Sequence, residues 1–414
     1  MSQISTNFLR LSHEDGKSYS MKPLQSLGFL GGGQLSRMLV ESLQELRLEG
    51  ETQAQERCLV DDRQCPVSEV TKQFQVGSAH SLEDLKNFFK YCDAVSFENE
   101  FVLAHLFRQV SPCDLVVRPE LSIIETIQDK LKQKTLLASL NIPTARHELF
   151  VDREQTKKQF GSEYILKWSR LGYDGKGVLF VRDSVADETI EAFLLEARKK
   201  QSPVFVEEKI PFQKELAIVA ARGVSGDILF YPPVETIQAK GVCEWVFSLE
   251  EQEEKKISQM IEPWLRALLE KLDYVGVLAM ELFQTPSGLY VNELAPRVHN
   301  SAHYSQWALS ESQFDSHNRA VLGLPLKSFE RRAPFFGMMN LLGEEDFMIT
   351  HFHHPFLPVP GQFYWYDKAH SKPGRKMGHV NFMASTKEEF EESKKKLVQF
   401  KSKLWESLKK ESVR

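Results

Sequence analysis

A lysine in a strand-like run followed by a glycine-rich loop is the first pattern in this sequence that could do chemistry. The stretch LKWSRLGYDGKG places Lys167 in an apolar run, and three glycines with a second lysine, Lys176, follow it. Glycines let the backbone approach an anion closely, and ammonium groups offset phosphate charge. The pattern predicts a grip on a nucleotide triphosphate, although it lacks the spacing of a P-loop. Taken alone, an ordinary hairpin turn with a surface lysine explains it equally well.

Two carboxylates farther along the chain favour the nucleotide interpretation. Glu281 follows the apolar run VGVLAM, Glu293 follows GLYV with Asn292 beside it, and the turn QTPSG joins the two strands. Mg²⁺ bound to phosphates keeps several waters and takes one or two protein oxygens. Solvated charges at strand ends are the alternative, but an unpaired charge in an apolar strand pattern is costly. The pair therefore predicts a magnesium site.

The elements that position these residues alternate between strand and helix. At the start, SLGFLGGGQLSRMLVESLQEL predicts a strand, a glycine loop and a helix with Leu35, Met38, Leu39 and Leu43 on its buried face. Two more buried strands, RCLVDD and CDAVSF, flank the helical stretch SLEDLKNFFKYC. This alternation predicts a parallel sheet with its ligand side at the carboxyl ends of the strands. A helix N-terminus after a glycine loop also favours a bound anion.

A second unit mixes strands and helices. Its expected elements are strands around 164–168 and 178–182, a helix near 186–200, the strand PVFVEEKI, and a hairpin whose turn lies between Gly223 and Gly226. Short strands follow. The chain closes with an amphipathic helix, in which Thr386 and Glu389 form a capping box and Leu397, Phe400, Leu404 and Leu408 form one apolar stripe.

Bulk composition restricts the possible partners. The 414 residues carry 52 basic and 57 acidic side chains, a net charge of −5, so the general electrostatic footprint of a nucleic-acid-binding protein is missing. The five cysteines show neither a C-x-x-C pair nor zinc spacing, which is typical of a reducing cytoplasm. The polar N-terminus has no apolar h-region, and no stretch reaches the roughly 18 apolar residues of a membrane span. We expect a cytoplasmic protein with no membrane partner.

Several short motifs occur in the order typical of one enzyme family. They are GGGQL, SFENE, QDKLKQK, GYDGKG, NELAPRVHNS, SQFDSHNRAVLGLPL and GRKMGHVN. Metal carboxylates on adjacent strands, a glycine-rich lid and a strand lysine resemble the ATP-grasp ligases. The motifs closely resemble the 5-(carboxyamino)imidazole ribonucleotide synthase family, the ATP-dependent carboxylases of purine biosynthesis. The resemblance covers roughly residues 24–385, everything except the two ends.

The resemblance implies an α/β (α+β) fold. This is an ATP-grasp fold with an N-terminal Rossmann-like pre-ATP-grasp domain and a small C-terminal β-rich domain. The implied divisions are the pre-ATP-grasp domain (24–122), the ATP-grasp domain (123–333, with a lid at about 150–212) and the C-terminal β domain (334–385). Outside the resemblance, the polar residues 1–23 are expected to form a flexible extension, and residues 386–414 a lysine-rich amphipathic helix.

The resemblance also implies which residues bind Mg²⁺ and ATP. Lys130 and Lys167 would contact phosphates or adenine, Glu215 would bind the ribose, and Glu281 and Glu293 would hold Mg²⁺. The other implied nucleotide contacts are the lid residues Gly172, Tyr173, Asp174, Gly175, Lys176 and Gly177, the linker residues Glu207, Glu208, Lys209 and Ile210, and also Gln238 and Asn292.

The implied substrates are aminoimidazole ribonucleotide and bicarbonate. Bicarbonate would attack the γ-phosphate to give carboxyphosphate and ADP, and the exocyclic amine would then capture the carboxyl group. Arg297 is expected to stabilise carboxyphosphate, because a guanidinium matches a planar bidentate anion. Tyr173, Asp174 and Lys176 would act as the loop shuts. The residues implied to hold the ribonucleotide are Gln34, Leu35, Glu98, Asn300, Lys368, Arg375 and Lys376.

Some roles stay open at this point. His299 and His303 are either proton carriers or structural hydrogen-bonding histidines. The family also implies a homodimer and a functional link to the mutase that rearranges the labile product.

Four positions depart from the family pattern. Ser36 and Ala302 replace glycines, Lys130 replaces an arginine, and Gln238 stands where a histidine is common. Serine and alanine need only a right-handed backbone, and lysine keeps the charge. Gln238 is the change most able to alter nucleotide contacts.

Three other functions compete with this interpretation. A formate-dependent glycinamide ribonucleotide transformylase shares the fold, but its lid lacks the Tyr-Asp pair. A dinucleotide-dependent oxidoreductase would use GFLGGGQL, although Ser36 occupies the last glycine position of that fingerprint. A non-catalytic interaction protein would not need Lys167, Glu281 and Glu293.

Overall fold

The N-terminal part of the protein is a parallel sheet covered by helices. The computed structural model describes residues 10–11, 19–20, 23–172 and 176–412. The parallel strands follow the order β5 (Phe74–Val76), β4 (Gln55–Val60), β3 (Ser26–Leu30), β6 (Ala94–Phe97) and β7 (Val116–Val117). The helices are α1 (Gln34–Leu48), η1 (Pro66–Glu69), α2 (Leu82–Phe89) and α3 (Ala104–Val110). β1 (Arg10–Leu11) and β2 (Tyr19–Ser20) pair with each other outside this sheet.

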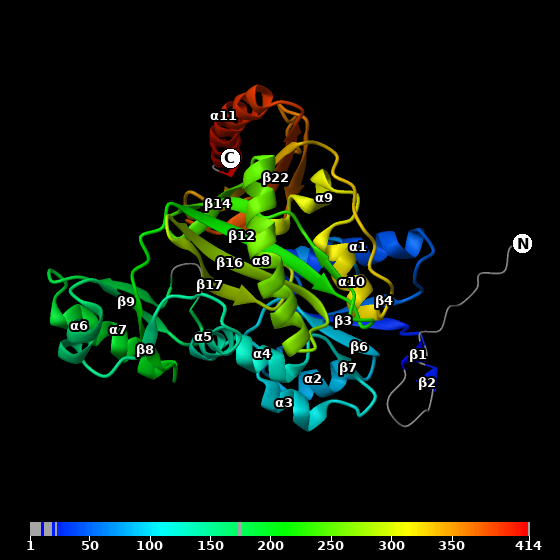
Figure 1. Ribbon diagram of the computed structural model, residues 1–414. Coiled ribbons are helices and arrows are strands. Elements are labelled where there is room, and N and C mark those ends of the chain that lie inside the picture. The colour runs from blue at the N-terminus through cyan, green and yellow to red at the C-terminus, as the bar shows by residue number, and fades with distance from the viewer. Residues whose placement is uncertain (1–9, 12–18, 21–22, 173–175, 413–414) are drawn as a thin grey trace, which may run out of the picture.

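Two helices lead from this sheet into a small antiparallel sheet, which we call the lid. In Figure 1 the lid stands apart from the N-terminal sheet, at the lower left. The connecting helices are α4 (Leu121–Ile127) and α5 (Lys130–Ser139). The lid strands follow the order β10 (Val178–Val181), β9 (Tyr164–Trp168), β11 (Val204–Glu208) and β8 (His147–Leu149), covered by α6 (Arg153–Phe160) and α7 (Asp187–Lys199).

A nine-stranded antiparallel sheet forms the centre of the molecule (Figure 1). Its order is β17 (Gly288–Ala295), β16 (Gly276–Thr285), β12 (Lys214–Arg222), β14 (Val234–Ala239), β15 (Val242–Ser248), β18 (Phe335–Leu342), β22 (Lys376–Ala384) and β20 (Gly361–Trp365), and β13 (Ile228–Phe230) also pairs with β12. β19 (Phe347–Met348) and β21 (His370–Ser371) form a separate two-stranded sheet.

Helices cover both faces of the central sheet. The apolar stripe of α8 (Glu251–Lys271) packs on one face of β12, β16 and β17. On the other face, α10 (Gln313–Leu322) lies between the sheet and α1, beside η2 (Asn300–Ala302) and α9 (Ser305–Ala308). Near the top of Figure 1, α11 (Lys387–Ser412) packs on the β18–β22–β20 end of the sheet.

The predicted fold class is confirmed, and several local predictions hold as well. The buried face of α1 contains Leu35, Met38, Leu39 and Leu43, and the apolar stripe of α11 is buried. The turn after β12 has Gly226 at φ +89, which favours glycine there. No helix within the described residues combines the length and apolar character of a membrane span.

The short strands predicted after α10 are present as β19, β20 and β21, but two longer strands lie among them. β18 and β22 have 8 and 9 residues, and both continue the central sheet that the preceding strands begin. Their length follows from pairing on both sides, since β18 lies between β15 and β22. At the start of α11, the Thr386 hydroxyl accepts from the Glu389 N–H as predicted, but the Glu389 carboxylate accepts from Ser385 rather than Thr386.

Candidate active site

A cavity of about 650 Å³ opens between the lid, the central sheet and the loop after β6. It brings together residues from several separate stretches of the sequence. Those predicted as site residues and found in its lining are Lys130, Lys167, Gly172, Lys176, Glu207, Glu208, Lys209, Ile210, Glu215, Gln238, Glu281, Asn292, Glu293, Arg297, Asn300 and Lys376.

Glu281 and Glu293 are direct cross-strand partners on β16 and β17. A β-bulge at this point opposes Asn292 to no residue of β16, so Asn292 and Glu293 both line the cavity although they are consecutive. Burial, with the negative charges of Glu293 and Glu215, raises the pKa of Glu281 to about 7. Lys130 donates to Glu293 at 2.7 Å. The site thus holds two close carboxylates with incomplete charge compensation.

A buried carboxylate holds two lysines beside the cavity. Glu207 forms ion pairs with both Lys134 and Lys167, and its side chain is only 2% exposed. Burial acts to raise the pKa of Glu207, but the charges of Lys167 and Lys134 outweigh it and lower that pKa to about 2. Lys134 was not predicted as a site residue. Its position one helical turn after Lys130 on α5 was the available signal.

The linker after β11 lines the same cavity. Glu208 accepts from the backbone N–H of Arg146 at 2.7 Å, and Lys209 pairs with Glu163 at 2.7 Å. Because the Glu207 carboxylate is occupied by its two lysines, an adenine contact by Glu207 would have to come from the backbone. The prediction that this linker binds adenine stays a prediction.

Arg297 is oriented by a carboxylate from the N-terminal domain. Its Nε and Nη2 atoms donate to the two oxygens of Glu100 at 2.6 and 3.4 Å. Burial opposes the charged form of Glu100, but Arg297 outweighs it and lowers the pKa of that carboxyl. Glu100 belongs to the motif SFENE, from which only Glu98 was singled out. Arg297 and Glu100 lie 197 positions apart, so no local pattern in the sequence pairs them.

The loop after β17 contributes further polar groups. His299 Nε2 lies 3.4 Å from Glu281, and burial with the nearby charge of Arg297 lowers the His299 pKa well below its usual value. Asn300 exchanges hydrogen bonds of 3.0 and 2.7 Å with Asn340 on β18. His303 is 1% exposed and lies outside the cavity lining, where Gln313 contacts its Nδ1.

The glycine loop before α1 surrounds a side chain of the protein, the Glu98 carboxylate. Glu98 accepts from the N–H groups of Gly33 and Leu35 at 2.8 and 3.3 Å. A Cβ at Gly31 or Gly33 would lie 2.2 or 2.1 Å from the Glu98 carboxylate oxygens. The glycines therefore make room for Glu98, and a substrate phosphate at this helix N-terminus would compete with it.

Most of the residues predicted to hold the ribonucleotide lie outside the cavity lining. Burial raises the pKa of Glu98, and the charge of Lys368 acts in the opposite direction. Lys368 donates to the carbonyl oxygen of Lys376 at 2.8 Å, and Arg375 donates to that of His370 at 2.8 Å. Of the residues predicted to bind the ribonucleotide, Asn300 and Lys376 reach the cavity, whereas Gln34, Leu35, Glu98, Lys368 and Arg375 do not.

Known proteins resemble this chain in both sequence and structure. Family models match residues 24–128 (ribonucleotide synthetase preATP-grasp domain), 135–314 (ATP-grasp domain) and 337–393 (phosphoribosylaminoimidazole carboxylase C-terminal domain). The N5-carboxyaminoimidazole ribonucleotide synthase of Synechococcus elongatus is 35% identical over 374 residues, which are 88% of this chain and 91% of that protein. The chain belongs to the N5-carboxyaminoimidazole ribonucleotide synthase family.

Solved structures of N5-carboxyaminoimidazole ribonucleotide synthases share the whole fold. The enzyme of Aspergillus clavatus complexed with ATP has a TM-score of 0.80 at 30% identity and covers 92% of this chain and 99% of its own. A complex of the synthase from the same organism with ADP and 5-aminoimidazole ribonucleotide has a TM-score of 0.79 at 30% identity, covering 91% and 99%. The prediction of an ATP-grasp ligase is confirmed, and the transformylase, oxidoreductase and non-catalytic alternatives were wrong.

The four departures from the N5-carboxyaminoimidazole ribonucleotide synthase pattern fit this structure. Ser36 lies within α1 and Ala302 within η2, so both have the right-handed backbone that the sequence predicted. Lys130 keeps a cation beside Glu293. Gln238 on β14 lines the cavity, where it can contact a nucleotide.

Part of the predicted lid loop lies outside the described residues, namely Tyr173, Asp174 and Gly175. Gly172 and Lys176, on either side of this gap, both line the cavity. Gly177 has φ +73, and a Cβ there would lie 2.7 Å from the Trp168 ring, so glycine is required for the loop to return to the sheet.

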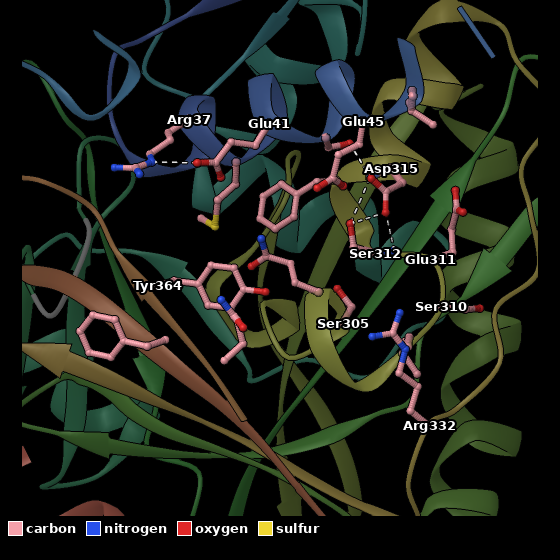
Figure 2. A pocket seen from close by; sticks show the side chains of 18 of the residues that line it. Arg37, Glu41, Glu45, Ser305, Ser310, Glu311, Ser312, Asp315, Arg332 and Tyr364 are labelled. Atoms are coloured by element: carbon pink, nitrogen blue, oxygen red, sulfur yellow. Dashed lines mark hydrogen bonds and ion pairs between the residues drawn. The ribbon is translucent and has the colours of Figure 1, made fainter. Parts of the chain in front are cut away.

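A second cavity of about 520 Å³ lies on the far side of η2, between α1, α9, α10 and β20. Figure 2 shows Arg37, Glu41 and Glu45 on α1 facing Tyr364 and Ser305. Arg37 pairs with Glu41, which also lines this cavity, and with Asp367, which does not. Of the residues predicted for catalysis or binding, none that the structure describes lines it.

Proposed function

We propose that this chain carboxylates 5-aminoimidazole ribonucleotide with bicarbonate and ATP, giving N5-carboxyaminoimidazole ribonucleotide, ADP and phosphate in purine biosynthesis. The observation that carries the proposal is the pairing of Glu281 with Glu293 across two strands, beside the cations Lys130, Lys167 and Arg297. That arrangement suits a metal-bound triphosphate. The Aspergillus clavatus complex with ADP and 5-aminoimidazole ribonucleotide supports the choice of acceptor.

Mg²⁺ fits the two carboxylates. The raised pKa of Glu281 indicates that close negative charge at this point lacks full compensation, which a dication would supply. Among the residues that the structure describes, no group of three or more His, Cys, Asp or Glu side chains could hold a metal alone. Two protein carboxylates are the usual share for Mg²⁺ bound to phosphates. When bound, Mg²⁺ neutralises phosphate charge and orients the triphosphate.

The nucleotide lies, in this proposal, between the lid and the central sheet. Lys167 and Lys176 offset phosphate charge from the lid, while the linker at Lys209 and Ile210 meets the adenine and Glu215 the ribose. Glu215 suits a neutral hydroxyl partner, because burial raises its pKa. Glu208, Gln238 and Asn292 complete the cavity wall around the nucleotide.

The chemistry depends on positioning and charge neutralisation. Bicarbonate oxygen attacks the γ-phosphorus, the bond to the β-phosphate oxygen breaks, and ADP leaves. Arg297 stabilises the resulting carboxyphosphate with the guanidinium N–H groups that Glu100 and the Val298 carbonyl leave available. The exocyclic amine of the ribonucleotide then attacks the carboxyl carbon of carboxyphosphate and expels phosphate, or it attacks CO₂ after carboxyphosphate has broken down to CO₂ and phosphate. In both routes the amine nitrogen loses a proton, which phosphate can accept. Tyr173 and Asp174, which lie outside the described residues, are proposed to act in the same step.

The ribonucleotide approaches from the N-terminal domain. Asn300 and Lys376 reach the cavity, and Lys368 lies close enough to Glu98 to act on its charge, which links this side to the glycine loop at Gln34 and Leu35. Arg375 is proposed to bind the same substrate. Glu98 suits a hydroxyl or amine of the substrate better than its phosphate. We also propose a cytoplasmic location, a homodimer, and delivery of the labile product to a mutase.

Release of ADP by the purified protein tests this function. Mg²⁺-ATP and aminoimidazole ribonucleotide are supplied with and without bicarbonate, and glycinamide ribonucleotide with formate serves as the comparison. We expect turnover with the imidazole substrate that depends on bicarbonate. ADP release at the same rate with and without bicarbonate, or only with glycinamide ribonucleotide and formate, would contradict the proposal.

A further inference from the structure

Two buried glutamine side chains hold the backbone of the segment 292–300, which carries much of the active site. This segment contributes Asn292, Glu293, Arg297, His299 and Asn300 to the cavity lining. Its first part belongs to β17, the edge strand of the central sheet, and its second part has left the sheet. An edge strand has one row of N–H and C=O groups that no neighbouring strand can satisfy.

Gln133 supplies the missing partner at Leu294. Its Oε1 accepts from the Leu294 N–H at 2.9 Å, and its Nε2 donates to the Leu294 carbonyl at 3.2 Å. The same amide group also donates to the carbonyl of Ile127. Gln133 is 3% exposed and comes from α5, so one side chain replaces a neighbouring strand immediately after Glu293.

Gln313 does the same at His299. Its Oε1 accepts from the His299 N–H at 2.8 Å, and its Nε2 donates to the His299 carbonyl at 2.7 Å. Backbone N–H groups only donate and carbonyls only accept, so the orientation of this amide is unambiguous. The Gln313 Nε2 atom also donates its second hydrogen to His303 Nδ1, at an N–N distance of 3.0 Å. His303 Nδ1 is therefore an acceptor, and the proton of the neutral imidazole lies on Nε2.

The position of Gln313 is itself fixed by its helix. It is the first residue of α10 and follows the N-cap residue Ser312, which forms a capping box with Asp315 (Figure 2). Its own N–H donates to the Ser305 hydroxyl at 3.1 Å, and its side chain is fully buried. Helix α10 in turn packs between α1 and the central sheet. The amide is therefore attached to a rigid element rather than to a loop.

We propose that Gln133 and Gln313 are positioning residues that set the segment 292–300 for phosphoryl transfer. Neither contacts the cavity, and together they fix the backbone on both sides of Arg297. The adenine side of the cavity comes from other elements, the lid and β12. Loss of either amide should therefore impair turnover more than nucleotide binding. The kinetic part of this inference rests on the proposed function, whereas its backbone part does not.

The test uses Gln313→Glu and Gln133→Glu. Each variant keeps the side-chain length and the Oε1 acceptor, but replaces the donating Nε2 by an oxygen that faces the carbonyl of His299 or Leu294. Gln362→Glu makes the same change at an exposed position on β20 and is the matched control. ADP-binding sites are counted by calorimetry, and kcat is expressed per binding site. We expect ADP affinity within about threefold of the parent and a fall in kcat of about 10- to 100-fold, since a misplacement of about 1 Å can cost that much.

Hydrogen exchange supplies a readout that needs no turnover. In the parent, the amide hydrogens of Leu294 and His299 should exchange slowly, and each variant should accelerate exchange in 292–300 but not in β16. A kcat per binding site within about twofold of the parent in both variants would overturn the proposal. Hydrogen exchange in 292–300 that is the same in both variants as in the parent would also overturn the proposal. This outcome can be read even if the parent shows no bicarbonate-dependent turnover.

Gln313→Met and Gln133→Met keep the length without a charge and are used if the glutamate variants do not fold. If both methionine variants also fail to bind ADP, the two amides are general determinants of stability and the positioning role is wrong.

Discussion

Replacing Glu207 by glutamine should destabilise the protein more than any exposed ion pair could. The Glu207 carboxylate is 2% exposed and neutralises two lysines, Lys134 and Lys167, whose side chains are 3% and 11% exposed. Glu207→Gln keeps the shape of the side chain but leaves two ammonium groups without their shared partner. Such groups lose their solvation by water and receive no equivalent charge in return.

The size of the effect follows from the pairing and from the pKa of Glu207. Breaking a buried ion pair by removing one partner typically costs about 3–5 kcal/mol. The pKa of Glu207 falls from 4.5 to about 2 on folding. At roughly 1.4 kcal/mol per pKa unit, this corresponds to about 3 kcal/mol of stability at neutral pH. Because the pKa is lowered, this stability is present above pH 4.5 and is lost as the pH falls toward 2.

The assay is urea unfolding followed by circular dichroism, on the parent and on Glu207→Gln, at neutral pH and at steps down to about pH 3. We expect the free energy of unfolding of the variant to be about 3–5 kcal/mol lower at neutral pH and to depend less on pH below 4.5. Adding Lys134→Met to Glu207→Gln removes one unpaired charge and should restore part of the loss.

Glu163→Gln is the matched control in the same lid. It breaks the pair of Glu163 with Lys209, whose side chains are 55% and 51% exposed, and should leave the unfolding midpoint unchanged within error. A loss below about 1 kcal/mol for Glu207→Gln, the range of exposed pairs, would refute the reasoning. So would a double variant no more stable than Glu207→Gln alone.

Two further predictions concern Arg297 in the cavity and Gly33 in the glycine loop before α1. Arg297→Lys should abolish bicarbonate-dependent ADP release and leave ADP binding intact in calorimetry, because lysine cannot keep both contacts to Glu100 and still present a planar fork; near-normal turnover would disprove this role. Gly33→Ala should lower the free energy of unfolding by about 1–3 kcal/mol, because its Cβ would lie 2.1 Å from the Glu98 carboxylate. If Gly33→Ala costs as much in a Glu98→Ala background, the clash with Glu98 is not the cause.

Local patterns were enough to predict the parts of the site that lie close together in the chain. Glu281 and Glu293 belong to one hairpin, so strand alternation and a short turn place them opposite each other. Lys167 and the glycines after it belong to one strand and the loop that follows. The apolar faces of α1 and α11 follow from helical periodicity in the same way.

The sequence by itself thus determined most of the elements, their order and the pairing of Glu281 with Glu293. Only the tertiary structure decided which charges meet across domains. Arg297 pairs with Glu100, and Glu98 occupies the helix N-terminus at which the sequence predicted a bound anion. The same holds for the joining of β18 and β22 to the central sheet. Contacts between distant residues leave no period in the sequence, because burial and charge compensation fix them only when separate elements pack together.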